Sequence, residues 1–137
     1  MDKVTKFFGI DISKEVFDVS LPDGGHVQFT NDSEGHQQLC DLLDEHSQCV
    51  MEATGSYHQQ LATRIATSCY KVSVVNPLVI KRFAQMRLRL AKTDKADAKT
   101  IRQYAELEQP EVWSPPQEFI SQSTEINSLV MLFIRQR

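Results

Sequence analysis

Residues 4–29 read VTKFFGIDISKEVFDVSLPDGGHVQF, and this stretch decides the predicted fold. Residues 4–12 are rich in Phe, Ile and Val, which favour strands, and polar and apolar residues then alternate over residues 16–21. Residues 22–25, Pro-Asp-Gly-Gly, have the composition of a tight turn, and Val-Gln-Phe follows at 27–29. The stretch therefore predicts three consecutive antiparallel strands.

Helices and strands alternate in the pattern that follows this meander. Asp32 or Ser33 can cap a first helix, and the apolar residues 49–51 predict a short buried strand. Ser56 begins a capping-box pattern before a second helix, residues 72–75 predict a last strand, and a further helix follows. This order predicts an α/β domain with one mixed five-stranded sheet flanked by helices.

The composition fits one globular domain. The chain has 137 residues, of which 41% are hydrophobic, enough for one buried core. Its longest apolar stretch, residues 129–134, is far shorter than the ~20 residues that cross a bilayer, and the first residues lack the pattern of a signal peptide. The three cysteines form no CxxC pair. We therefore expect a cytoplasmic protein with no membrane partner, no zinc knuckle and no disulfide framework.

The basic residues are concentrated in one part of the sequence. Nine lysines and arginines lie between Lys71 and Arg102, against only Asp94 and Asp97, in a chain whose net charge is −3. A basic segment that holds two acids suits a phosphate backbone running past a metal centre. A solvated cationic helix explains the charge pattern equally well.

Four carboxylates form the candidate site: Asp11, Glu52, Asp94 and Asp97. The first two follow apolar runs and are predicted at strand ends, whereas the last two are three residues apart and would share a helix face. Carboxylate oxygens suit Mg²⁺ or Mn²⁺, and two such ions can stabilise the attacking and leaving oxygens of phosphoryl transfer. Three of the acids also have a structural interpretation: Asp94 as a helix-terminus charge, Asp97 as a lysine partner and Asp11 as a turn residue. Glu52 is harder to explain in this way, because it has few neutralising partners nearby in the sequence.

Four motifs of the chain resemble a known family: FGIDISK at residues 8–14, VMEATGSY at 50–57, Asn-Pro at 76–77 and KTDKADA at 92–98. In this order they are similar to the N-terminal DEDD domain of IS110-family transposases, which Piv-type DNA invertases resemble, over about residues 5–107. The resemblance implies an RNase H-like fold close to that of RuvC resolvases. It also implies a Mg²⁺- or Mn²⁺-dependent DNA transposase or site-specific recombinase whose catalytic metal ligands are Asp11, Glu52, Asp94 and Asp97.

The resemblance also sets the expected domain organisation and partners. Residues 1–109 are expected to form the RNase H-like DEDD metal-binding domain, and residues 110–137 a linker and the start of a C-terminal helical extension of coiled-coil type. Family members carry a further domain with a serine nucleophile, which would follow Arg137, so we expect an incomplete enzyme here. DNA is the implied partner, a non-coding bridge RNA guides some members, and homo-oligomerisation is expected.

Within the implied site, we hypothesise that Asp11, Glu52 and Asp97 bind the divalent ions most directly and that Asp94 completes the set. The phosphates of DNA or RNA would lie along five basic side chains, and such contacts set the affinity and not the base sequence that is bound. These side chains are Lys81, Arg82, Arg87, Arg89 and Lys92.

Two alternatives from other classes stay open. In the first, the chain is a non-catalytic nucleic-acid-binding or assembly module whose acids are structural. In the second, it is a sugar-kinase or actin-like ATPase, which also opens with a Gly-Ile-Asp strand but needs a second phosphate loop and a longer chain.

Overall fold

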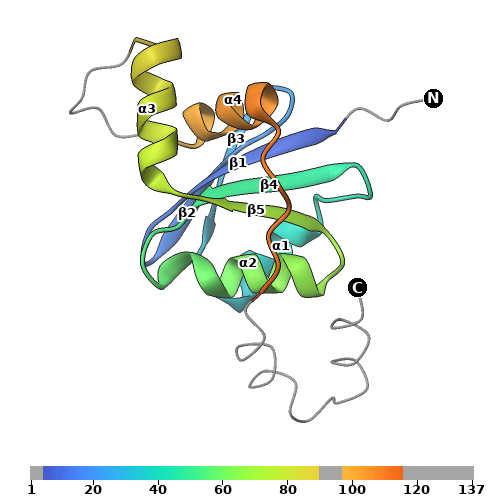
Figure 1. Cartoon of the computed structure of the whole chain (residues 1–137). Coiled ribbons are helices and arrows are strands. Elements are labelled where there is room, and N and C mark those ends of the chain that lie inside the picture. Colours follow the sequence, from blue (N-terminus) through green and yellow to red (C-terminus); the bar gives the residue numbers. More distant parts are fainter. Residues whose placement is uncertain (1–4, 90–96, 116–137) are drawn as a thin grey trace.

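A five-stranded sheet with two helices on each face forms the centre of the computed structural model, which describes residues 5–89 and 97–115 (Figure 1). The strands are β1 (Lys6–Ile12), β2 (Val16–Ser20), β3 (His26–Thr30), β4 (Ser47–Glu52) and β5 (Lys71–Val75). The helices are α1 (Ser33–Cys40), α2 (Tyr57–Thr67), α3 (Pro77–Arg87) and α4 (Ala98–Glu108). The predicted order of elements is confirmed, and the basic part of the chain contributes two helices instead of one.

The sheet is mixed, as predicted. Its strand order is β3-β2-β1-β4-β5, in which β2 is antiparallel to both β1 and β3. The other two pairs, β1 with β4 and β4 with β5, are parallel. This arrangement confirms the α/β prediction and is consistent with the RNase H-like fold that the resemblance implies. The predicted C-terminal helical extension lies mainly at residues 116–137, outside the described residues.

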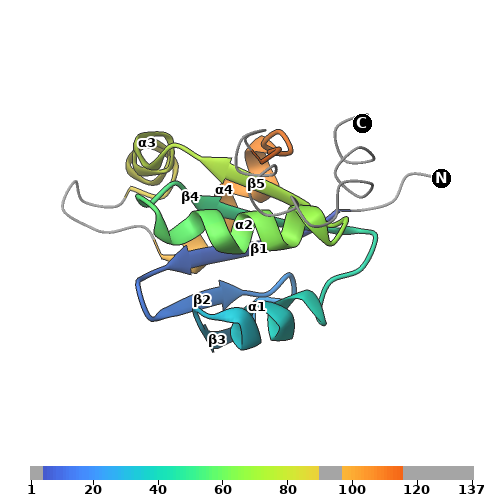
Figure 2. The ribbon, with the colours of Figure 1, turned by 90° about the horizontal axis from the view of Figure 1, so that it is seen from below.

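The larger hydrophobic core lies between the sheet and the pair α1 and α2 (Figure 2). Successive side chains of a strand point to opposite faces, so Phe8 and Ile10 of β1 enter this core together with Phe17 of β2. Leu39 of α1 and Leu61 of α2 cover them, and all of these side chains are buried. The alternating pattern of the meander therefore determines which face receives α1 and α2.

A smaller core lies on the opposite face, under α3 and α4. Phe7 of β1 and Val50 of β4 pack there against Ile80 of α3 and Ile101 of α4. At Gly9, the helix backbone reaches the strand: a Cβ atom at this position would lie 2.2 Å from the carbonyl oxygen of Ala98. The absence of a side chain at this position lets α4 lie directly on β1.

Side chains from just outside the helices fix two of their starting points. Asp32 caps α1, because its Oδ1 accepts a hydrogen bond from the backbone N–H of Gly35 at 2.8 Å. Asn76 caps α3 in the same way, accepting from the N–H of Leu78 at 2.8 Å. The capping box predicted at Ser56 is wrong: this residue precedes α2 in a helical conformation and its side chain makes no capping hydrogen bond.

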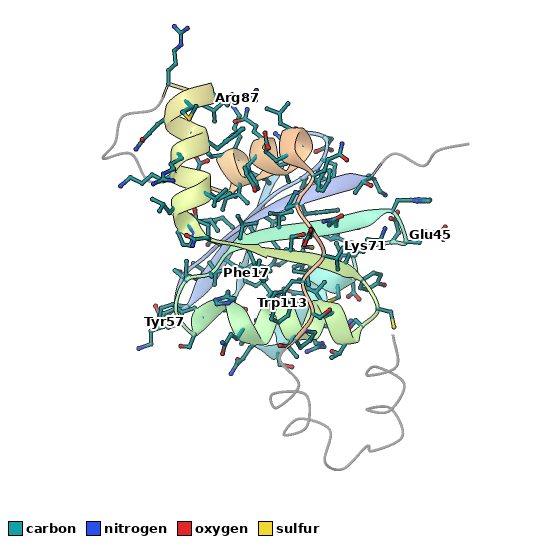
Figure 3. All side chains as sticks on the ribbon, viewed as in Figure 1. Phe17, Glu45, Tyr57, Lys71, Arg87 and Trp113 are labelled. Atoms are coloured by element: carbon teal, nitrogen blue, oxygen red, sulfur yellow. The ribbon has the colours of Figure 1, made fainter. Side chains whose placement is uncertain are left out.

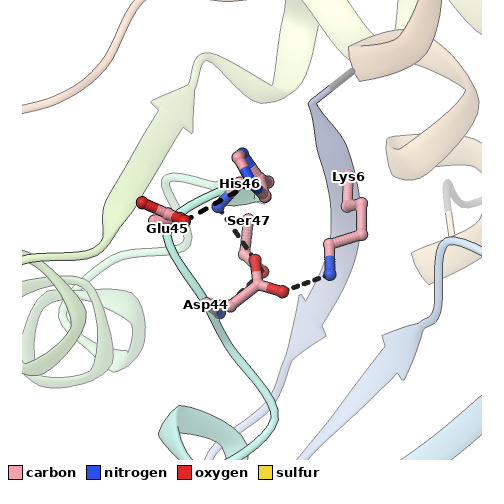
Figure 4. Close-up of polar contacts among 5 residues, drawn as sticks. All are labelled: Lys6, Asp44, Glu45, His46 and Ser47. Atoms are coloured by element: carbon pink, nitrogen blue, oxygen red, sulfur yellow. Dashed lines mark hydrogen bonds and ion pairs between the residues drawn. The ribbon is translucent and has the colours of Figure 1, made fainter. Parts of the chain in front are cut away.

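A turn stabilised by Asp44 leads into β4 (Figure 4). The carboxylate accepts hydrogen bonds from the N–H of His46 at 2.8 Å and from Ser47 Oγ at 3.1 Å, and it forms an ion pair with Lys6. The hydrogen bond from Lys6 is the main reason that the pKa of Asp44 is lowered to about 2. Because Lys6 is also the β1 residue that pairs with Ser47, the turn ties the starts of the two central parallel strands together.

Residues after α4 cover the edge of the sheet beside β5. The backbone N–H of Trp113 donates to Val72 O at 2.7 Å, and Ser73 Oγ donates to Glu111 O at 2.6 Å. Gln48 Nε2 donates to Ser73 Oγ at 2.8 Å and to the carbonyl oxygen of Pro110 at 3.0 Å. This segment crosses from the α4 side of the sheet to the α2 side, where the Trp113 side chain packs on the larger core (Figure 1). The described start of the predicted linker is therefore packed against the sheet.

The three cysteines differ in how far they are exposed to solvent. Cys40 and Cys49 are buried in the larger core, whereas Cys69 is exposed. None of the helices in the described ranges is long and apolar enough to cross a membrane.

The buried His36 predicts a loss of stability in mild acid. Its side chain lies within hydrogen-bond distance of Asn31 Oδ1, at 2.7 Å, and burial lowers its pKa below the ordinary value, with the charge of Arg64 acting in the same direction. The folded state therefore disfavours the protonated ring, which the unfolded state accepts at its ordinary pKa of about 6.5. The contribution of His36 to the free energy of unfolding is therefore complete above about pH 6.5, and the free energy of unfolding falls as the pH drops below this value. The slope cannot exceed about 1.4 kcal/mol per pH unit for one histidine.

Melting temperatures between pH 7.5 and 5.5 measure this effect. His36→Gln keeps an amide donor for Asn31 but cannot titrate, so its melting temperature should fall less steeply than that of the wild type over this range. Equal slopes for the two proteins would show that His36 does not contribute.

Candidate metal centre

The parallel register of β1 and β4 brings Asp11 and Glu52 together. Ile10 pairs with Met51, so the next residue of each strand is Asp11 on β1 and Glu52 on β4. Neighbouring strands are about 4.8 Å apart, and residues in register point to the same face. Both acids are partly buried and lie at the carboxyl ends of their strands, as the sequence predicts.

The first turn of α4 lies on the same face of the sheet. Gly9 and Asp11 are two residues apart on β1 and share a face, and Ala98 lies against Gly9. Farther along α4, Ala105 packs in the same cluster as Phe7 near the start of β1. The helix therefore runs opposite to β1, and its N-terminus points toward the strand ends that carry Asp11 and Glu52.

Asp97 is the N-cap of α4. Its Oδ1 accepts hydrogen bonds from the backbone N–H and from Oγ1 of Thr100, each at 2.9 Å. The predicted shared helix face of Asp94 and Asp97 is wrong, because Asp97 has an extended backbone and the helix begins only at Ala98. Asp94 lies outside the described residues, as does Lys92.

These observations give only part of the expected set of metal ligands. Among residues 5–89 and 97–115, no three His, Cys, Asp or Glu side chains lie close enough together to hold a metal ion. The adjacent carboxylates of Asp11 and Glu52 fit Mg²⁺ or Mn²⁺ in their donor chemistry, because these ions prefer hard oxygen ligands. The described residues therefore provide two neighbouring oxygen donors and a third acid, Asp97, at the same end of the sheet.

Asp18 is a further acid beside this site that sequence reasoning did not select. In the antiparallel β1–β2 pair it stands directly opposite Asp11, so the two side chains share a face. Its Oδ1 accepts a hydrogen bond from Gln28 Nε2 at 2.8 Å and lies 3.6 Å from His26 Nε2. The signal was present in the hairpin register, since Asp11 and Asp18 are equally far from the centre of the turn between the strands.

The basic side chains are presented by α3 and the residues after it. Lys81, Arg82 and Arg87 are exposed on α3, and Arg89 is exposed two residues beyond it. Figure 3 shows Arg87 extending from the end of α3 that is farther from the sheet. Because α3 follows β5, and Val75 pairs with Glu52, the helix starts beside the acidic strand ends.

Arg102 differs from these exposed cations. Its side chain is only 12% exposed, Nε donates to Ser20 Oγ at 2.8 Å, and NH1 lies 2.8 Å from Glu106 Oε2. The bond to Ser20 attaches α4 to β2, so part of the positive charge counted in the sequence is structural. Lys71 is also exposed, but it lies at the start of β5. In Figure 3 it is at the opposite end of the sheet from Tyr57, the first residue of α2, which comes after the acidic end of β4.

Comparison with known proteins identifies the family. Residues 8–130 match the model of the DEDD domain of IS110-type transposases, described as "Transposase". Pilin gene-inverting proteins from Moraxella bovis and Moraxella lacunata are 34% and 35% identical to the chain in alignments 118 residues long, which cover 80% of this chain. A Streptomyces coelicolor protein, the mini-circle putative transposase for IS117, is 30% identical in an alignment 107 residues long, which covers 71% of this chain and 26% of that protein.

The matched relatives are much longer than this chain. The chain spans 37% of the length of each Moraxella relative. The match to the family model, by contrast, includes both strand-end acids, both acids of the KTDKADA motif and the whole of α3. The chain therefore belongs to the IS110 family of transposases.

Proposed function

We propose that the chain is the metal-binding catalytic domain, expected over residues 1–109, of a DNA transposase or site-specific recombinase. In this proposal Asp11, Glu52, Asp94 and Asp97 bind Mg²⁺ or Mn²⁺. The observation that carries it is the parallel register, which sets Asp11 beside Glu52 on the face where the N-terminus of α4 brings Asp97. Family membership supports the same assignment.

The chemistry follows from the nature and place of these side chains. When bound, divalent ions supply charge stabilisation to the attacking and leaving oxygens of phosphoryl transfer. Asp11 and Glu52 orient the site because they extend from paired strands of a packed sheet, whose backbone is rigid. The cap formed by Asp97 Oδ1 fixes that carboxylate relative to α4, so the position of the helix on Gly9 sets the position of the acid.

DNA is the proposed substrate, held through its phosphates. Lys81, Arg82, Arg87 and Arg89 are exposed on and after the helix that starts beside the acids, and Lys92 is proposed to extend this row. Such contacts supply affinity and orientation without reading base sequence. The relatives named for pilin gene inversion support DNA as the substrate class.

For the whole protein we propose Mg²⁺-dependent strand cleavage and transfer together with the serine nucleophile of the family. The matched relatives extend well beyond the aligned region, and the proposal places that serine outside residues 8–130. Assembly into a homo-oligomer, and guidance by a non-coding bridge RNA, belong to the same proposal.

A second function is supported by the capping role of Asp97. Because this acid has a structural partner in Thr100, the acids could serve folding in a non-catalytic nucleic-acid-binding or assembly module. This alternative predicts DNA affinity that is the same with and without Mg²⁺ and is unchanged by Asp11→Asn.

Calorimetric titration of Mn²⁺ and Mg²⁺ into the wild type and into Glu52→Gln tests the proposed centre. We expect saturable binding by the wild type and a loss of about tenfold or more in affinity for the variant, since an amide oxygen carries no charge. Glu45→Gln is the matched control, because Glu45 is exposed at the opposite end of β4 (Figure 3). Equal affinities for all three proteins, or no binding by the folded wild type, would contradict the proposal.

A further inference from the structure

The loop between Glu52 and α2 donates a backbone hydrogen bond to a buried histidine ring. The β4–β5 ladder continues for one residue beyond the strand, since the N–H of Ala53 donates to Val75 O at 3.0 Å. The next N–H, that of Thr54, donates to Nδ1 of His58 at 3.1 Å. Gly55 then turns the chain with a φ of 62°. The ring therefore fixes the backbone two residues after the acid.

The Thr54 side chain does not share this task. Its Oγ1 is buried and has no hydrogen-bond partner among the described residues. The N–H of Tyr57 donates to Thr54 O at 3.3 Å, which closes the turn but ties it only to the start of α2. Beyond Ala53, the described hydrogen bonds of this loop run to the start of α2, and those to the His58 ring are the ones that reach a buried side chain.

His58 is well placed to act as a fixed anchor. It lies in the first turn of α2 and is only 7% exposed. A neutral imidazole has one nitrogen that accepts and one that donates, so acceptance at Nδ1 requires the proton to be on Nε2. Burial lowers the pKa of His58, which favours the neutral ring, while a backbone hydrogen bond with Gly55 acts in the opposite direction.

We infer that His58 is a positioning residue for Glu52: through Nδ1 it holds the loop after β4 and so fixes the direction of the Glu52 carboxylate. It acts on the backbone and not on a metal ion or substrate. The metal consequence of this inference rests on the proposed function, whereas the hydrogen bond and its effect on Glu52 do not. Removing an outer partner of a metal ligand typically weakens binding about 10- to 100-fold.

The other buried histidine offers a matched comparison. His36 is 4% exposed, has a lowered pKa caused mainly by burial, and pairs with Asn31 near the start of α1. It has no contact with the loop after β4 among the interactions that the described residues show. If His58 contributed to stability alone, replacing either histidine would have the same effect on metal affinity. If His58 positions Glu52, only its own replacement should weaken metal binding.

Nuclear magnetic resonance of the full chain without metal tests the bond and its effect. We expect His58 to carry its proton on Nε2 and the Thr54 amide to be protected from hydrogen exchange. In His58→Leu that protection should be lost and the carboxyl ¹³C resonance of Glu52 should shift. In His58→Asn, whose Oδ1 can accept in place of Nδ1, both should return toward the wild type. A proton on Nδ1, or a freely exchanging Thr54 amide in the wild type, overturns the inference even if a variant fails to fold.

Titration with Mn²⁺ tests the metal consequence. Affinity should fall about tenfold or more in His58→Leu, recover largely in His58→Asn, and stay unchanged in His36→Leu despite its lower melting temperature. Wild-type affinity in a folded His58→Leu overturns the inference while the proposed function stands. Failure of the wild type to bind Mn²⁺ overturns the proposed function, and with it the metal consequence, while the resonance of Glu52 still decides whether His58 positions the carboxylate.

Discussion

Replacing Gly9 by alanine is expected to destabilise the domain by ~3 kcal/mol or more, at or above the upper end of ordinary overpacking effects. A Cβ atom at Gly9 would lie 2.2 Å from Ala98 O, 2.5 Å from Arg102 N and 2.8 Å from Arg102 Cβ. Two of these atoms belong to the backbone of α4, so no side-chain rotation can relieve the overlap. The helix would have to move away from β1, carrying Asp97 with it.

Urea unfolding of Gly9→Ala and of a matched control measures this effect. Gly25→Ala makes the same chemical change in the β2–β3 turn, where the nearest atom would be Asp23 Oδ1 at 3.1 Å, at the free end of a side chain. We expect a small change in stability at Gly25 and a large one at Gly9. Equal stabilities of the two variants would show that α4 does not lie on β1 as described.

Removing two charges from α3 should have the second large effect, on DNA binding. In Arg82→Ala/Arg87→Ala, each lost phosphate contact should reduce the slope of log K against log salt by about 0.9. Near 0.1 M salt the two losses together correspond to about 60-fold weaker binding. Both side chains are exposed and both positions are helical, so alanine should preserve the fold.

Filter binding to duplex DNA between 50 and 300 mM salt provides the slopes. Lys71→Ala is the control for a lost surface charge, because Lys71 is exposed at the other end of the sheet from the start of α3 (Figure 3). We expect its slope to remain that of the wild type. An unchanged slope in the α3 variant would remove Arg82 and Arg87 from the DNA-contacting surface and turn attention to Lys99, which is exposed on α4.

Short-range patterns predicted the order of elements well because they reflect local physics. Alternation with a period of two predicted β2, and Asp32 was one of the two predicted caps of α1, because a cap needs only the N–H groups of the next residues. The same logic failed at Ser56 and missed the cap at Asp97. At Ser56 the local backbone is helical, whereas a capping residue needs an extended backbone, and sequence spacing does not reveal this difference.

By itself, the sequence predicted that Asp11 and Glu52 lie at strand ends, because each follows a short apolar run of the length typical of a buried strand. Only the tertiary structure decided that the two acids are neighbours. They are 41 positions apart in the chain, and they become neighbours only because β1 and β4 pair in this parallel register. The approach of Asp97 likewise depends on α4 lying against the bare backbone of Gly9, a contact between distant segments that no local pattern encodes.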